Sequence, residues 1–309
     1  MDKNWKDSQL LKIKDNDSIF QFIPSEIGDL VYCDTDQPNQ KAMSKEDAKK
    51  RKFWAISICI ILLALYWVFL YDHYIWGIIF SAVVIFFTIG FSDTTFSGTD
   101  FFVGTEGFAI VKFIGSRDNI ISTKIILFKD MELFFTGEVI EKQNYVYQRT
   151  NFYFSIYGKY NDENQKYSLL YNLEGDYNDK KPKDPFNPKN ASNEYCMMKI
   201  VEAVWSKHFV KEHINDEVVN FSVYLKEDDS LYKDAIKIFK NEIEVYGTRY
   251  SKATTKDIYV SNGQLVIEHI NHSKKWFGFV EKGNISYVPL TYLGNRESFL
   301  AFFYSLYNK

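Results

Sequence analysis

The chain has 309 residues, with 37 Lys and Arg, 40 Asp and Glu, and a formal net charge of −3. This balance gives no reason to expect nucleic-acid binding, which requires an excess of basic residues. The cysteines Cys33, Cys59 and Cys196 are odd in number and scattered, so they predict no disulfide framework and no Cys-x-x-Cys pair.

Residues 1–52 form a polar N-terminal segment. Within it, the apolar run 19–23 is typical of a short strand ended by Pro24. Residues 34–52 are charged, and we expect them to begin as a loop. Their last part, 44–52, is expected to start a helix, with Ser44 as its N-cap. The sequence leaves open whether this segment joins a later sheet.

Two apolar runs, 53–70 and 75–91, follow almost end to end, and neither contains a charged residue. Each is about long enough to cross a bilayer core of ~30 Å as a helix. The four residues between them leave room only for a tight turn, which predicts an antiparallel transmembrane hairpin over 53–91. The alternative is a buried hairpin of a soluble protein, but core helices normally carry a polar stripe. Small residues of the second run are expected to pack on small residues of the first or, alternatively, on a second copy of the chain. They are Gly77, Ser81 and Ala82, facing Ala55, Ser57 and Ala64.

A cluster of basic residues precedes the first run, whereas the turn between the runs has no Lys or Arg. The cluster consists of Lys45, Lys49, Lys50, Arg51 and Lys52. The positive-inside rule therefore places the N-terminal flank and the long C-terminal part in the cytoplasm, and the turn outside. The same cluster would also attract anionic lipid, by ~1 kcal/mol per basic residue near the surface.

After the hairpin the apolar period changes to two, which predicts an antiparallel meander in residues 92–214. The expected strands are 108–113, 120–128, 132–140, 145–149, 152–158 and 166–171. Residues 174–193 hold three of the six prolines and are expected to form a surface loop. Ser192 then caps a predicted helix that runs to about His213. Its expected buried stripe is Met197, Ile200, Val201, Val204, Trp205, His208 and Phe209. A meander closed by one helix resembles a pleckstrin-homology-like domain, a small barrel plugged by its helix.

Residues 215–309 read as a second, smaller unit of the same plan. The expected strands are 218–225, 242–247, 257–260, 265–270 and 276–280. Helices are expected at 229–239, with Ala235, Ile236 and Phe239 on one face, and at 293–307. Ser261-Asn262-Gly263 predicts a hairpin turn.

The last sixty residues carry the pattern Lys256-Asp257-Ile258, Asn262–Ile267, Lys274–Phe277, and Asn295 followed by Phe299-Leu300. Together with the hairpin, this pattern resembles a family of uncharacterised bacterial membrane proteins with two spans and a pleckstrin-homology-like cytoplasmic part. The resemblance implies a bacterial inner-membrane location. It implies no catalytic residues, because no activity is established for that family.

The sequence contains no nucleophile elbow, phosphate loop, dinucleotide fingerprint or zinc-protease motif. His269 and His272 lie near Glu268, but a metal site would need a third ligand and an orienting shell. His208 and His213 are five residues apart, which is off the spacing that shares a helix face. We therefore predict no enzyme activity, no cofactor and no metal.

One surface loop has a physical basis for binding. Lys274, Lys275, Trp276 and Phe277 combine two cations with two large aromatic rings beside a turn. Such a loop would contact lipid headgroups or hold an anionic ligand by charge and stacking. In the alternative, Trp276 and Phe277 belong to the core and the lysines are solvated.

These observations predict an α+β protein: a transmembrane hairpin followed by antiparallel barrel or sandwich units, each closed by a C-terminal helix. The expected partners are the lipid bilayer, a protein at the cytoplasmic face and, through the small-residue patch, a second copy of the chain. The favoured function is a membrane-anchored interaction or scaffold protein. The alternative is an accessory subunit of a larger membrane transport or envelope complex, and an enzyme of unknown type is third.

Overall fold

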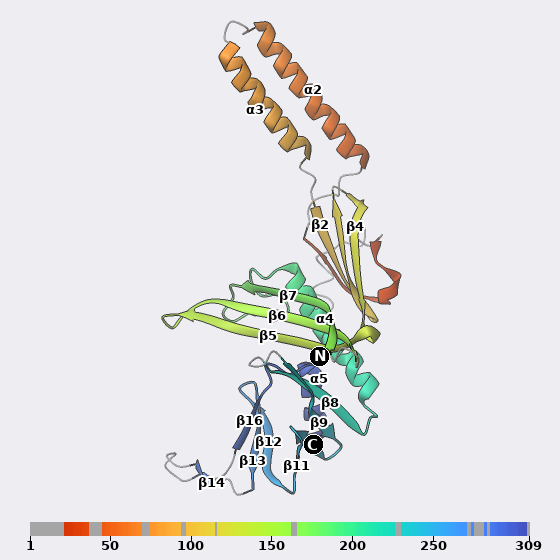
Figure 1. Ribbon diagram of the computed structural model, residues 1–309, viewed down its shortest axis with the longest axis vertical. Coiled ribbons are helices and arrows are strands. Elements are labelled where there is room, and N and C mark those ends of the chain that lie inside the picture. Colours follow the sequence, from red (N-terminus) through yellow and green to blue (C-terminus); the bar gives the residue numbers. More distant parts are fainter. Residues whose placement is uncertain are drawn as a thin grey trace. The chain divides into compact units, whose positions relative to one another are not determined.

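The computed structural model describes residues 22–36, 45–69, 74–93, 97–114, 116–161, 166–225, 230–270, 273–274, 281–282 and 285–307. Within these residues the fold is mixed α+β, with four α-helices and several antiparallel sheets, none of them closed into a barrel (Figure 1). The predicted α+β class is confirmed, whereas the predicted barrel closure is not found. The chain divides into two compact units, one of Met1–Gly104 with Phe108–Ile125 and one of Thr105–Gly107 with Ile126–Lys309.

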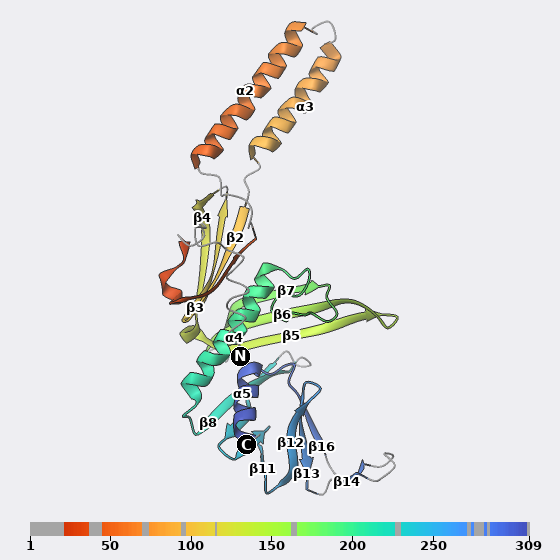
Figure 2. The same cartoon turned by 180° about the vertical axis from the view of Figure 1, so that it is seen from behind.

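The predicted hairpin is present as two helices, α2 (Lys45–Phe69) and α3 (Tyr74–Asp93), which lie side by side (Figures 1 and 2). The expected helix start at Ser44 falls just outside the described residues. Gly77 of α3 faces Tyr66 of α2 so closely that an added Cβ would lie 2.7 Å from its ring. Trp67 Nε1 donates a hydrogen bond to Ser81 Oγ over 3.4 Å. Gly77 and Ser81 therefore meet the first helix, as expected, but they meet aromatic rings rather than small residues.

The first unit also contains a four-stranded sheet in the order β1-β2-β3-β4. Its strands are β1 (Leu30–Thr35), β2 (Ser97–Gly104), β3 (Gly107–Ile114) and β4 (Ser116–Leu127). β1 precedes the hairpin and β2 follows it, yet the two pair antiparallel, with Thr35 opposite Asp100. The N-terminal segment therefore does join a later sheet, and the expected loop at 34–52 overlaps the end of β1. The expected strand at 19–23 lies mostly outside the described residues, and Phe22 and Ile23 are not in a strand.

An apolar cluster and a buried ion pair stabilise this sheet. The apolar cluster consists of Ile27, Cys33, Phe102, Ala109 and Val111. Arg117 Nε donates to Asp100 Oδ2 over 2.7 Å, and its Nη2 reaches Thr35 Oγ1 over 3.1 Å. The ion pair joins β4 to β2, and the hydrogen bond to Thr35 joins β4 to β1, so Arg117 links strands on both sides of the hairpin.

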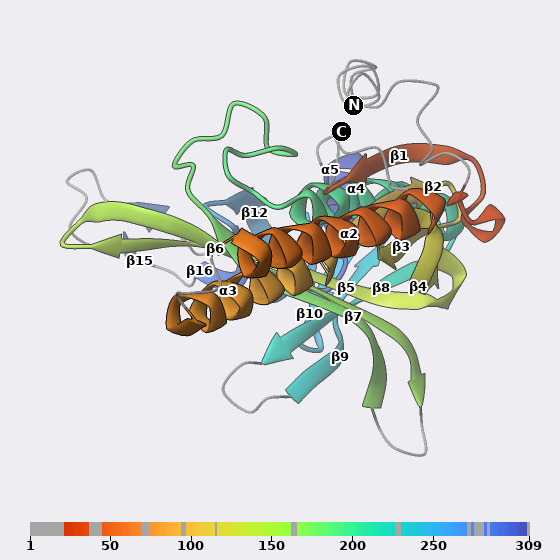
Figure 3. The ribbon, with the colours of Figure 1, turned by 90° about the horizontal axis from the view of Figure 1, so that it is seen from above.

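The second unit begins with the sheet β5 (Met131–Gln143), β6 (Val146–Asn161) and β7 (Lys166–Tyr177) and the helix α4 (Asn193–His213), labelled in Figure 3. The segments expected at 145–149 and 152–158 form one continuous strand, and β7 runs three residues past the start of the expected loop at 174. The predicted cap of α4 is confirmed, because Ser192 Oγ accepts from the Tyr195 backbone N–H over 3.1 Å. The predicted stripe is confirmed at Met197, Ile200, Val201, Trp205 and Phe209, which are buried.

Three further sheets follow in the chain. The first contains β8 (Val218–Leu225), β9 (Ser230–Phe239), β10 (Glu242–Val245) and β11 (Thr248–Ser251). The second contains β12 (Thr255–Ser261), β13 (Gln264–His269) and β16 (Ile285–Pro289). The third consists of β14 (Ser273–Lys274) paired with β15 (Glu281–Lys282). The helix predicted at 229–239 is wrong, because this segment is strand β9. The predicted turn is confirmed, since Asn262 and Gly263 have φ of 50° and 72° between paired Ser261 and Gln264. The strand expected at 276–280 lies outside the described residues.

The chain ends in helix α5 (Arg296–Tyr307), close to the predicted 293–307. Phe302 of α5 meets Phe209 of α4 at a ring distance of 6.5 Å, and Phe221 of β8 meets Phe299 of α5 at 5.3 Å. These contacts cross the expected boundary at 214. Residues on both sides of it therefore share one core, and the division into compact units differs from the expected domains at 92–214 and 215–309.

Candidate functional site

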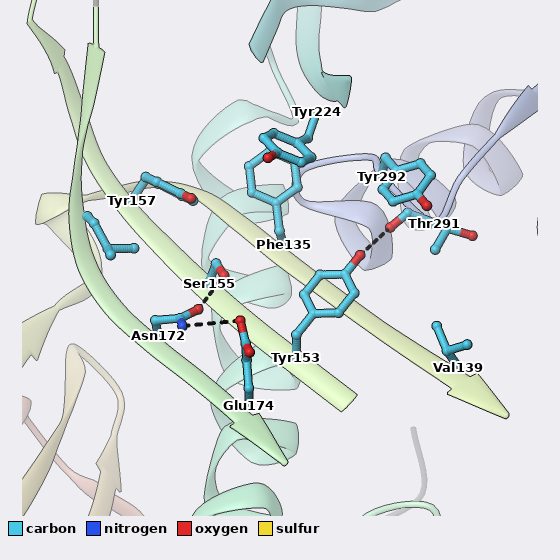
Figure 4. Close-up of a pocket in the computed structure, with 11 residues that line it drawn as sticks. Phe135, Val139, Tyr153, Ser155, Tyr157, Asn172, Glu174, Tyr224, Thr291 and Tyr292 are labelled. Carbon is cyan, nitrogen blue, oxygen red and sulfur yellow. Dashed lines mark hydrogen bonds between the residues drawn. The ribbon is translucent and has the colours of Figure 1, made fainter. Parts of the chain in front are cut away.

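A pocket of about 520 Å³ lies in the second unit, on one face of the β5-β6-β7 sheet (Figure 4). Side chains alternate along β6, so that Phe152 and Phe154 turn to α4, where each ring contacts Tyr195. The intervening Tyr153, Ser155 and Tyr157 point to the opposite face and line the pocket. The full lining is Phe135, Val139, Tyr153, Ser155, Tyr157, Leu169, Asn172, Glu174, Tyr224, Thr291 and Tyr292.

Aromatic rings form much of the pocket wall. Phe135 makes edge-to-face contacts with Tyr157, at a ring distance of 5.8 Å, and with Tyr224, at 6.3 Å. Tyr153 is fixed by its hydroxyl, which donates to the Thr291 carbonyl over 3.0 Å (Figure 4). Tyr292 comes from the same segment as Thr291. The rings are therefore brought together from β5, β6, β8 and the segment before α5.

The Tyr153 ring can occupy its position because its cross-strand neighbour, Gly137, has no side chain. The two residues are direct cross-strand partners on β5 and β6. A Cβ added to Gly137 would lie 2.3 Å from Tyr153 Cε1, closer than any real contact. Burial raises the pKa of the Tyr153 hydroxyl, and the nearby Tyr292 hydroxyl adds to this effect. The Tyr153 phenol therefore stays neutral over the ordinary pH range.

A short polar chain runs along one side of the pocket. Ser155 Oγ donates to Asn172 Oδ1 over 2.7 Å, and Asn172 Nδ2 donates to Glu174 Oε1 over 3.5 Å (Figure 4). Glu174 is exposed to solvent. Among the described residues that line the pocket, it is the only charged one. The pocket thus combines neutral aromatic walls with a single negative charge.

Asn295 fixes the segment that carries Thr291 and Tyr292. Its Oδ1 accepts from the Phe134 backbone N–H and from Trp205 Nε1, each over 3.0 Å. Its Nδ2 donates to the Glu132 carbonyl over 2.9 Å. One asparagine therefore ties the start of α5 to β5 and to α4, and with it the segment that closes one side of the pocket.

The described lining holds few of the groups that are used in acid–base or nucleophilic catalysis. The pocket lining described above contains no His, Cys or Lys, and Glu174 has no second carboxylate beside it in that lining. In the part of the chain that the structure describes, no group of three His, Cys, Asp or Glu is placed to hold a metal ion. His269 Nε2 instead lies 3.2 Å from Ser286 Oγ, and His272 falls outside the described residues.

The residues predicted from the sequence lie elsewhere. Lys274 is in β14, opposite Glu281, while Lys275, Trp276 and Phe277 fall outside the described residues, so their role stays a prediction. The basic cluster of Lys45, Lys49, Lys50, Arg51 and Lys52 lies on the first two turns of α2, as expected. The pocket itself was missed by sequence reasoning. The available signal was the alternation of tyrosines at 153 and 157 with phenylalanines at 152 and 154.

No protein-family model matches the chain, and no curated protein or solved structure is significantly similar to it. The family resemblance noted in the sequence therefore stays a prediction, and function has to be argued from the residues alone.

Proposed function

We propose that this protein is a membrane-anchored binding protein, held in the bilayer by the α2–α3 hairpin and active through its second unit. The observation that carries the proposal is the exposure of α2. Its stretch Lys49–Val68 is long and apolar enough to cross a membrane, yet only 6% of it is buried. A core helix of a soluble protein would be mostly covered, and a bare apolar surface of this size is costly in water.

The pairing of β1 with β2 supports two crossings rather than one. Because Thr35 and Asp100 are direct partners, the chain leaves the sheet before α2 and returns to the same place after α3. An odd number of crossings would put these partners on opposite sides of the bilayer. The described apolar stretch of α3, Ile75–Thr88, is shorter than a full span. The whole helix has 20 residues, or roughly 30 Å, which matches the hydrocarbon core.

The basic cluster at the start of α2 supports a cytoplasmic position for both flanks of the hairpin and hence for the second unit. The family resemblance adds the expectation of a bacterial inner membrane. The pleckstrin-homology-like layout belongs to this proposal only as a finer expectation about the sheets, and the binding role does not rest on it, since fold does not determine function.

Single-cysteine labelling of intact cells tests the anchor. The background is a Cys-free chain, with one cysteine introduced at Asp36, Asp72 or Asn262 and a membrane-impermeant maleimide as the reagent. We expect labelling at position 72 alone, with all three positions labelled after lysis. Labelling at 36 and 262 but not at 72 would invert the topology, and equal labelling of all three in intact cells would exclude the proposed span.

A hairpin-deleted variant provides the matched control. Replacing residues 45–93 by a short Gly-Ser linker leaves β1 and β2 able to pair through an ordinary turn. We expect the full chain to stay in the membrane fraction after an alkaline carbonate wash, and the deleted chain to be soluble. A full chain released by carbonate would contradict the anchor without affecting the pocket.

A further inference from the structure

We propose that the aromatic pocket of the second unit binds an organic cation, specifically a methylated ammonium group. The inference names the ligand class of the binding role proposed above and rests on that role, but it is independent of the membrane anchor. It is carried by the rings of Phe135, Tyr153, Tyr157, Tyr224 and Tyr292 together with the carboxylate of Glu174.

The charge of the lining selects a cation. The π-face of an aromatic ring is negative, so several rings around one space attract a positive group, most strongly when it is poorly hydrated. A methylated ammonium fits this description, because its methyl groups also gain from contact with apolar walls. The one charged side chain of the described lining, Glu174, is negative. An anionic ligand would meet this carboxylate and the ring faces without a cationic partner.

The polar chain gives Glu174 a defined position. Asn172 Nδ2 donates to Glu174 Oε1, and Asn172 is itself held by Ser155 Oγ. Figure 4 shows the three side chains on one side of the pocket, with Tyr153 beside them. The carboxylate of Glu174 therefore lies where it attracts a cation seated between the rings.

Arg296, a cation near Tyr153, is engaged by carboxylates outside the pocket lining. Arg296 is close enough to lower the pKa of Tyr153, which burial and Tyr292 raise. Its guanidinium, however, lies 3.8 Å from Glu202 and 3.5 Å from Glu297, and it donates to the Thr136 carbonyl. Its charge is thus offset by two carboxylates outside the lining.

The size of the pocket suits a ligand larger than the ammonium group alone. About 520 Å³ falls within the range of ordinary ligand pockets, and Val139 and Leu169 extend the wall with apolar surface. Two sources carry a methylated ammonium group to such a site. One is the headgroup of a choline lipid, and the other is a soluble molecule or a protein side chain with the same group. The shared chemistry is the methylated cation, and the experiment below distinguishes the sources.

The test measures binding of choline chloride to the full chain in a non-ionic detergent by isothermal titration calorimetry. The control ligand is 3,3-dimethylbutan-1-ol, which has the shape of choline but no charge. We expect choline to bind at least about tenfold more tightly than this neutral isostere, as cation–π contacts and one carboxylate allow. Equal affinity would overturn the proposal and leave an apolar pocket, and so would the absence of choline binding to folded protein.

Three variants sharpen the test. Glu174→Gln keeps the side-chain shape and removes the charge, so we expect choline affinity to fall about fivefold or more while the neutral isostere is unaffected. Tyr224→Ala removes one ring and is expected to weaken choline binding by a similar factor. Tyr145→Ala is the matched control, because Tyr145 is 99% exposed and does not line the pocket. Equal losses for Tyr145→Ala and Tyr224→Ala would overturn the assignment to this pocket.

Reconstituted vesicles identify the source. The chain is placed in phosphatidylglycerol vesicles with and without phosphatidylcholine, and the affinity for soluble choline is measured in each. Competition by phosphatidylcholine would assign the site to lipid headgroups, and unchanged affinity would assign it to a soluble or protein-borne cation. The anchor is scored separately by carbonate extraction, so its failure and the failure of this inference give different results.

Discussion

Replacement of Asn295 by alanine should destabilise the second unit more than most single substitutions. Asn295 is 5% exposed and has a φ of 54°, a conformation that asparagine tolerates better than most residues. Its side chain satisfies the Phe134 N–H, the Trp205 indole N–H and the Glu132 carbonyl. Alanine would leave all three groups without this partner. The two donors among them, the Phe134 N–H and the Trp205 indole N–H, make buried hydrogen bonds.

The magnitude follows from these contacts. Each buried polar group left unsatisfied costs about 1–3 kcal/mol. The two buried donors therefore account for roughly 2–6 kcal/mol, and the positive φ adds about 1 kcal/mol for alanine. We expect a loss of about 4 kcal/mol in the free energy of unfolding, a large share of the ~5–15 kcal/mol that a domain commonly has.

The assay is urea unfolding of the full chain in detergent, followed by hydrogen exchange of peptides from β5 and α4. Asn262→Ala is the matched control, because Asn262 also has a positive φ, 50°, but lies exposed in the turn between β12 and β13. It should cost only the backbone term of ~1 kcal/mol. If Asn295→Ala lowers stability no more than Asn262→Ala does, the three side-chain hydrogen bonds do not stabilise the fold, and the reasoning fails.

Three further predictions concern the pocket, pH and the first unit. Gly137→Val places a branched side chain where the Tyr153 ring lies, because a Cβ at position 137 would be 2.3 Å from Tyr153 Cε1. Choline binding measured by calorimetry should therefore be lost, while the cooperative unfolding transition remains. Burial and a neighbouring glutamate raise the pKa of Tyr177 from 10.0 to about 12. The neutral phenol therefore contributes stability that is complete below pH 10 and is lost as pH rises toward 12, and Tyr177→Phe should flatten this alkaline decline in urea unfolding. Arg117→Met should lower the unfolding free energy of the first unit by about 3–5 kcal/mol, because Asp100 would stay buried without its partner. The double variant with Asp100→Leu should recover most of this loss. A double variant no more stable than the single one would contradict this account.

The sequence predicts those elements whose signal is local. The helix from Asn193 to His213 was predicted from its cap and its apolar spacing, and both are present. The strand Val218–Leu225 and the Asn262-Gly263 turn were predicted in the same way, from alternation and turn chemistry. In these cases the residues that define the element are within one or two turns of one another, and tertiary contacts reinforce the local preference.

Strand β9 shows where the local signal misleads. Ala235, Ile236 and Phe239 have helical spacing, yet the segment pairs on both sides, with Ile236 opposite Val245 and Phe221. Asp234 has a φ of 55°, and the register with β8 shifts at this point. An irregular residue of this kind moves the following side chains to the other face, so the alternation of two is broken and looks like a helical period.

The pocket could not be assigned from the sequence for a related reason. Both faces of β6 carry large aromatic residues, with phenylalanine at 152 and 154 and tyrosine at 153 and 157. The alternation indicates that the two sets lie on opposite faces of the strand. It does not indicate which of the two faces a helix covers. That choice is made by α4 on one side and by the segment with Thr291 and Tyr292 on the other, both far away in the chain.

Strand β1 was missed because its partner lies beyond the hairpin, and this separation explains how the first unit assembles. Closing a long flexible loop between Thr35 and Asp100 would cost more conformational entropy than closing a short one. Two antiparallel helices remove most of that length, because they return the chain to where it started. The hairpin thus brings β1 and β2 together, and the Arg117–Asp100 pair, which also reaches Thr35, then joins the strands on its two sides. In the full chain, formation of this sheet should therefore depend on formation of the hairpin, whereas a short linker in place of the hairpin would still let β1 and β2 pair, because it too keeps the two strand ends close.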